Sequence, residues 1–115
     1  MIKVGLSDDI TDYNKKMENY IIRYGNENHI KVKITAYGSG SQLLLNFQKR
    51  KFDIIFLDVS MPELDGFETA ERIRSIDENV VIVFCTSFYT ISNAGKGFEV
   101  DAEDFLSKRS EEHTS

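Results

Sequence analysis

The sequence contains one cysteine, Cys85, so it can form neither an intrachain disulfide framework nor a cysteine-based metal site. This scarcity indicates a reducing compartment, and Cys85 itself is expected to be a buried strand residue. No apolar run approaches the roughly 20 residues of a membrane span, and the N-terminus lacks the pattern of a signal peptide. We therefore expect a cytoplasmic protein that does not enter the membrane.

The sequence also lacks a dense stripe of lysine and arginine, and its formal net charge is -5 over 115 residues. Proteins bind nucleic acids largely through the phosphates, so this composition disfavours direct DNA binding. Any contact with DNA would need a further domain. The residues that are present, 41% of them hydrophobic, suit one compact globular domain with its own core.

Strand and helix patterns alternate along the chain. Short apolar runs rich in β-branched residues predict strands, and apolar residues three or four positions apart predict amphipathic helices. The strands are expected near 1–6, 30–36, 52–57, 80–85 and 105–106, and the helices near 10–25, 41–47, 67–76 and 91–98. Ser41 is the expected N-terminal cap of the second helix. Gly95 and Gly97 should make the fourth helix the least rigid.

This alternation predicts an α/β fold with right-handed crossovers and helices on both faces of a parallel sheet. The expected architecture is a flavodoxin-like, doubly wound, five-stranded sheet of strand order 2-1-3-4-5. Residues 1–108 should form this single domain. Residues 109–115 contain no apolar side chain and should be a disordered or vector-derived tail, so the fifth helix of such a fold would be missing or truncated.

Five polar residues each follow a predicted strand, namely Asp8, Asp9, Asp58, Thr86 and Lys108. Because the carboxyl ends of parallel strands meet at one edge of the sheet, these side chains should converge. Three adjacent carboxylates need a cation, and an all-oxygen site that also receives a phosphate suits Mg²⁺. Asp58 would then attack phosphorus, while Lys108 neutralises charge and the Thr86 hydroxyl donates a hydrogen bond to the phosphoryl group.

Each of these residues alone has an ordinary structural explanation. Asp8 and Asp9 could cap a helix, Asp58 could belong to a turn, Thr86 could end a strand, and Lys108 could be solvated. Their joint position at one edge favours the functional interpretation. His29 and His113 are too few and too far apart in sequence to suggest a metal site or a catalytic pair.

The segment from Asp58 through Met61-Pro62 to Asp65-Gly66 resembles the phosphoacceptor loop of response-regulator receiver domains. The resemblance covers about residues 1–108. It implies that a sensor histidine kinase or a small acyl phosphate donates the phosphoryl group to Asp58. It also implies a Mg²⁺ site formed by Asp9, Asp58 and the carbonyl of Ser60, with Asp8 holding a metal-bound water.

The resemblance further implies a two-state switch. Phe105 would be the aromatic residue that turns inward when the Thr86 hydroxyl engages the phosphoryl group. The fourth helix and fifth strand would form the output surface, where a homodimer could form, and DNA would be reached only through an absent output domain. The tract 98–106 resembles regulators with a LytTR-type DNA-binding domain. Ser60 and Phe88 are hypothesised to tune water access and so the lifetime of the acyl phosphate.

Two departures from the family pattern stand out. Arg109 occupies the position where the family usually has a proline joined by a cis bond, and since a cis bond without proline costs roughly 2.5–4 kcal/mol, we expect a trans bond and a less constrained Lys108. The lack of a fifth helix should leave an apolar strip exposed beside the first and fifth strands, which favours low stability, self-association or a swapped partner helix.

Two other classes of function remain open at this point. One is a receiver-like interaction module that signals without phosphorylation. The other is an enzyme or cofactor protein of the same architecture, either a flavodoxin-like electron carrier or an aspartate-nucleophile phosphatase. Asp8 and Asp9 argue against the carrier because they would repel a flavin phosphate. Ser60 argues against the phosphatase, which needs a second acid two residues after its nucleophile.

Overall fold

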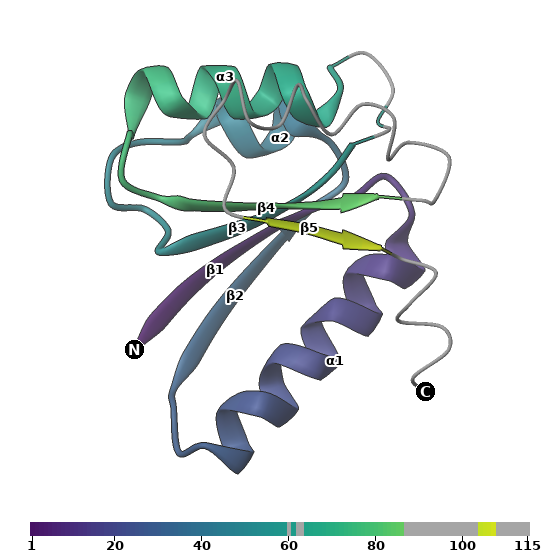
Figure 1. Cartoon of the computed structure of the whole chain (residues 1–115), viewed down its shortest axis with the longest axis vertical. Helices are drawn as coiled ribbons and strands as arrows, with labels where there is room; N and C mark the ends of the chain where they lie inside the picture. The colour runs from purple at the N-terminus through teal and green to yellow at the C-terminus, as the bar shows by residue number, and fades with distance from the viewer. Residues whose placement is uncertain (60, 62–63, 87–103, 108–115) are drawn as a thin grey trace.

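The computed structural model describes residues 1–59, 61, 64–86 and 104–107 of the chain. The described elements are β1 (Ile2–Ser7), α1 (Thr11–Glu27), β2 (Val32–Tyr37), α2 (Gly40–Leu45), β3 (Ile54–Asp58), α3 (Gly66–Ile76), β4 (Val81–Thr86) and β5 (Asp104–Ser107). The five strands form one parallel sheet of order β2-β1-β3-β4-β5 (Figure 1). The strand order predicted from the sequence is therefore confirmed.

The helices lie on both faces of the sheet, with α2 and α3 on one side and α1 on the other (Figure 1). The main core lies between the sheet and the α2–α3 layer. It contains Leu43, Phe47, Phe52, Ile55, Leu57, Val59, Phe67, Ala70, Ile73, Val80, Ile82 and Phe84. The unbroken apolar run in β3 suits a central strand of a sheet with helices on both faces (Figure 1).

The opposite face is less completely covered. Gly25 is the one fully buried residue of α1, and Tyr24 on the same helix is 62% exposed. An open, mostly apolar groove of about 530 Å³ runs between α1 and the strands β1 and β3, with Met17, Ile21 and Phe56 among its lining residues. The sequence predicts an exposed apolar strip beside the first and fifth strands. The groove lies beside β1. The side chains of β5 are not among those that the structure describes.

One predicted helix cap is wrong. The second helix begins at Gly40, and the Ser39 side chain accepts a hydrogen bond from the backbone N–H of Gln42 at 3.1 Å, so Ser39 rather than Ser41 is the cap. Ser39 has the extended backbone that a cap requires, whereas Ser41 already lies in the first helical turn. The boundaries of the described strands and helices agree with the sequence prediction to within about two residues.

Several predictions concern residues outside the described part of the chain. These are the fourth helix near 91–98 with Gly95 and Gly97, the trans bond before Arg109, and the tail 109–115 with the absent fifth helix. They stay predictions.

Candidate functional site

Three carboxylates meet at the carboxyl edge of the sheet. Asp8 directly follows β1, Asp58 ends β3, and these two strands are hydrogen-bonded neighbours. One carboxylate oxygen from each of Asp8, Asp9 and Asp58 lies within 4.8 Å of the other two. Asp8 and Asp58 are buried, with 6% and 4% of their surface exposed, whereas Asp9 is exposed. The convergence expected from the strand order is thus present.

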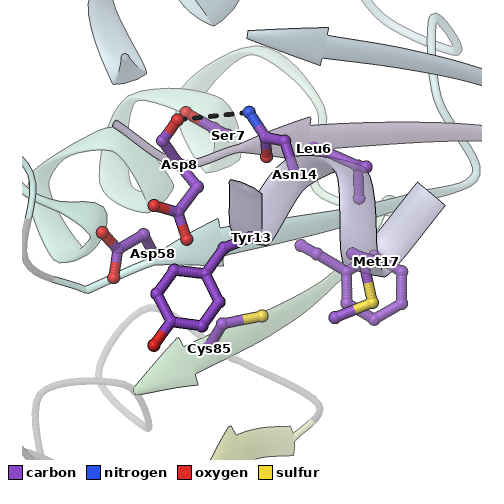
Figure 2. A pocket seen from close by; sticks show the side chains of 9 residues that line it. Leu6, Ser7, Asp8, Tyr13, Asn14, Met17, Asp58 and Cys85 are labelled. Carbon is purple, nitrogen blue, oxygen red and sulfur yellow. Dashed lines mark hydrogen bonds between the residues drawn. The ribbon is translucent and has the colours of Figure 1, made fainter. Parts of the chain in front are cut away.

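The orientation of Asp8 is fixed by the start of α1 and the end of β2. Its Oδ1 accepts a hydrogen bond from the backbone N–H of Ile10 at 2.9 Å, and its own N–H donates to the Tyr37 carbonyl at 3.2 Å. The Asn14 amide donates to the carbonyl of Asp8 at 3.2 Å (Figure 2) and to that of Tyr37 at 3.0 Å. Asn14 therefore links the loop that follows β1 to the end of β2.

The loop after Asp58 is anchored on both sides. The N–H of Val59 donates to the carbonyl of Cys85 on β4 at 3.2 Å, and the N–H of Gly66 donates to the carbonyl of Val59 at 3.0 Å. A Cβ atom on Gly66 would overlap the Asp58 carbonyl oxygen and would lie 2.9 Å from the Cα of Val59, so glycine is required for this close approach. Met61 is also buried there and accepts a hydrogen bond from the Ser7 hydroxyl at 3.4 Å to its sulfur.

A small cavity of about 20 Å³ lies beside Asp58, on the side facing α1. It is lined by Leu6, Ser7, Asp8, Tyr13, Asn14, Met17, Phe56, Asp58 and Cys85. Figure 2 shows the ring of Tyr13 next to Asp58, with Cys85 behind it. A volume of this size holds about one water molecule.

The other predicted site residues are described only in part. Thr86 is the last residue of β4, and its predecessor Cys85 pairs in register with Asp58, so the backbone of Thr86 lies at the same edge as the carboxylates. Phe105 lies in β5, in register with Phe84, but neither its side chain nor that of Thr86 is described. Ser60, Phe88 and Lys108 lie outside the described residues.

Comparison with known proteins resolves the family. A family model described as the response regulator receiver domain matches residues 6–114. The chain belongs to this family. The match spans the acidic loop, the loop after Asp58 and the last two strands, so every candidate site residue lies within the matched part of the domain.

Known relatives and solved structures of receiver domains agree with this assignment. The sensory transduction protein LytT of Oceanobacillus iheyensis is 38% identical over 72 residues, which are 61% of this chain and 28% of LytT. The probable transcriptional regulator ycf29 of Porphyra purpurea is 31% identical over 105 residues, or 90% of this chain and 47% of that protein. The chain thus spans less than half the length of these relatives.

Among solved structures, the non-phosphorylated HemR receiver domain of Leptospira biflexa matches with a TM-score of 0.80 and 20% identity, covering 94% of this chain and 82% of that chain. The receiver domain of AraT from Geobacillus stearothermophilus matches with a TM-score of 0.67 and 26% identity, covering 93% and 81%. These likenesses agree with the flavodoxin-like fold of the receiver domain.

The three carboxylates have the donor chemistry that Mg²⁺ requires. Its oxygen ligands lie about 2.0–2.1 Å from the ion, so ligands on opposite sides of the ion are about 4.2 Å apart. Donor oxygens that all lie within 4.8 Å of one another need only a small adjustment to reach this geometry. The buried carboxylates Asp8 and Asp58 also gain most from a neutralising cation, because burial disfavours adjacent negative charges.

Sequence reasoning missed the roles of Asn14 and Tyr13 in this receiver domain. The sequence patterns place both residues in the predicted helix near 10–25 without distinguishing them from its other residues. Their place in the first turn after Asp8 and Asp9 is the signal that could have revealed them, because the start of that helix faces the carboxyl edge of the sheet.

Within the described part of the chain, no helix is long and apolar enough to cross a membrane.

Proposed function

We propose that this receiver domain is a phosphorylation-dependent switch in which Asp58 accepts a phosphoryl group from a sensor histidine kinase. The observation that carries the proposal is the meeting of Asp58 with Asp8 and Asp9 at one edge of the sheet. A carboxylate beside two others is not made more reactive toward phosphate by them, because like charges repel. It becomes a useful nucleophile where a divalent cation offsets the repulsion between it and an incoming phosphate.

Each residue has a separate role in this proposal. Asp58 attacks phosphorus, while Asp9, Asp58 and the Ser60 carbonyl would hold Mg²⁺ and Asp8 would hold a water bound to the ion. When bound, the ion supplies positive charge that neutralises phosphoryl oxygens in the loose transition state. Lys108 adds a second positive charge, and the Thr86 hydroxyl donates a hydrogen bond to the transferred group. The domain assists its own phosphoryl transfer and dephosphorylation, and it is a switch rather than a conventional enzyme.

The output is proposed to pass through β4, β5 and the fourth helix. Thr86 and Phe105 would move together on phosphorylation and change the surface used by a partner or a second copy of the domain. Several relatives are named as transcriptional regulators, which supports regulation of transcription through an output domain beyond this segment. The proposed kinase partner implies a cytoplasmic location for the domain, which we include in the proposal.

Treating the protein with phosphoramidate and Mg²⁺, followed by intact-mass spectrometry, tests the proposal. We expect a mass gain of one phosphoryl group in the wild type, with no gain in the Asp58→Asn variant or in the presence of a chelator. A folded wild-type protein that gains no mass would instead support a receiver-like interaction module that works without phosphorylation.

A further inference from the structure

The cavity beside Asp58 has a mixed lining. Its polar lining residues are Ser7, Asp8, Asn14 and Asp58, and the others are Leu6, Tyr13, Met17, Phe56 and Cys85. Its volume of about 20 Å³ admits about one water molecule. The inner side of Asp58 is therefore screened by apolar groups.

Tyr13 lies four residues after Asp9, in the first turn of α1. Its backbone N–H donates to the carbonyl of Ile10 at 3.0 Å, and the N–H of Ile10 in turn donates to Asp8 Oδ1 at 2.9 Å. The half-buried ring extends from the first turn of α1 to a position beside Asp58 (Figure 2). The same hydrogen-bonded turn thus fixes both the metal-facing carboxylate and the aromatic wall.

We propose that Tyr13 is a positioning residue whose ring limits the space beside Asp58 to about one water molecule and thereby lengthens the lifetime of the aspartyl phosphate. This inference rests on the phosphoacceptor function proposed above. It concerns the reverse half of the switch, namely the loss of the phosphoryl group to water.

The physical reason lies in the charge that hydrolysis returns to Asp58. A water oxygen bonds to phosphorus while the bond between phosphorus and the Asp58 oxygen breaks. The electron pair of that bond stays on the carboxylate, and the water releases a proton to solvent. Because the transition state is loose, much of this negative charge is already on the carboxylate before the bond is fully broken. Additional water in an enlarged cavity would solvate this charge, and an aromatic wall does not.

The test compares Tyr13→Ala, Tyr13→Leu and Tyr13→Phe with the wild type. Tyr20→Ala serves as the matched control, because Tyr20 lies on the same helix but lines the groove rather than the small cavity. Each protein is loaded with phosphoramidate and Mg²⁺, the donor is removed, and the decay of the phosphorylated mass is followed. Unfolding in urea, recorded for each variant, separates this effect from a general loss of stability.

We expect Tyr13→Ala to shorten the lifetime by about fivefold, the effect of one ordinary hydrogen bond gained by the departing carboxylate. Tyr13→Leu should lie between Tyr13→Ala and the wild type. Tyr13→Phe and Tyr20→Ala should match the wild type, since the first keeps the ring and the second leaves the cavity intact.

Two results would overturn the inference. An unchanged lifetime in Tyr13→Ala would show that the wall does not control hydrolysis, and decay in Tyr13→Phe as fast as in Tyr13→Ala would assign the effect to the hydroxyl group. Failure of the proposed function is distinguishable, because the wild type would then carry no phosphoryl group when the decay begins.

Discussion

Gly66, the first residue of α3, packs directly against the backbone of Asp58, and its N–H is hydrogen-bonded to the carbonyl of Val59 at 3.0 Å. This contact brings the start of α3 to the end of β3 without an intervening side chain. Asp65, just before it, caps α3 by accepting a hydrogen bond from the N–H of Glu68 at 2.9 Å. The acceptor carboxylate thus sits on a strand end that the following helix holds in place.

Replacing Gly66 with alanine should disturb the acceptor site and lower stability together. The new Cβ would overlap the Asp58 carbonyl oxygen, and such overpacking typically costs about 1–3 kcal/mol. We expect a lower urea midpoint and slower mass gain with phosphoramidate. Gly38→Ala is the matched control, because its Cβ would meet only the Gln42 side-chain oxygen at 3.5 Å, and equal effects in both variants would contradict the argument.

The two serines at the start of α2 should differ in their contribution to stability. Ser39→Ala removes the side-chain acceptor for the Gln42 N–H, and loss of such a cap costs about 0.5–2 kcal/mol. Ser41→Ala changes an exposed residue in the first turn and should leave the unfolding free energy nearly unchanged. The measurement is urea denaturation of both variants, and a larger loss in Ser41→Ala would overturn the assignment of the cap.

Asp77 should make the domain more stable at neutral pH than in acid. The residue is 4% exposed, and burial by itself raises its pKa. Hydrogen bonds from the N–H groups of Arg50 and Asn79, together with the charge of Arg74, stabilise the carboxylate. These interactions outweigh burial, so the pKa of Asp77 lies below 3.8. A carboxylate with a lowered pKa contributes stability that is present above the unfolded pKa and is lost as the pH falls through the folded pKa. The hydrogen bond from the Arg50 N–H to Asp77 also holds a backbone whose φ of 65° is unusual for a residue other than glycine.

The Asp77→Asn variant tests this pH dependence. The difference in unfolding free energy between wild type and variant should be largest near neutral pH and should shrink as the pH falls below about 3.8, where the unfolded carboxyl is protonated. Urea denaturation at several pH values measures it. A difference that grows in acid would have the wrong sign.

Mg²⁺ should stabilise the folded domain through the acidic cluster. A ligand that binds only the folded state adds about 1.4 kcal/mol to the unfolding free energy when its concentration is about ten times its dissociation constant. A thermal melt can detect a change of this size. The wild type should respond to Mg²⁺, and Asp9→Asn should respond much less. Asp12→Asn is the control, since Asp12 is an exposed acidic residue in the first turn of α1 but does not belong to the cluster. Equal shifts in all three proteins would indicate nonspecific screening.

Much of this architecture could be predicted from the sequence because it depends on local patterns. The apolar run at 54–57 predicts a central strand, and the strand order follows from the alternation of strands and helices, so the meeting of Asp8 with Asp58 could be expected. Both depend on backbone periodicity and chain connectivity, which a single sequence expresses well.

The features that were missed depend on three-dimensional geometry rather than on local residue patterns. Ser39 and Ser41 are both plausible caps in sequence, and only the backbone angles distinguish them. Tyr13 has the spacing of a core residue of α1, and its position beside Asp58 depends on where the helix starts relative to β3. The need for glycine at position 66 arises from contact with a strand end eight residues earlier, which residue patterns do not express.

The most direct test of the account is to locate the phosphoryl group. The protein is treated with phosphoramidate with and without Mg²⁺, digested, and its peptides are sequenced by mass spectrometry. We predict a phosphoryl group on Asp58 when Mg²⁺ is present and almost none when the ion is chelated. A phosphoryl group on another residue, or equal modification of Asp58 without a divalent ion, would contradict the account.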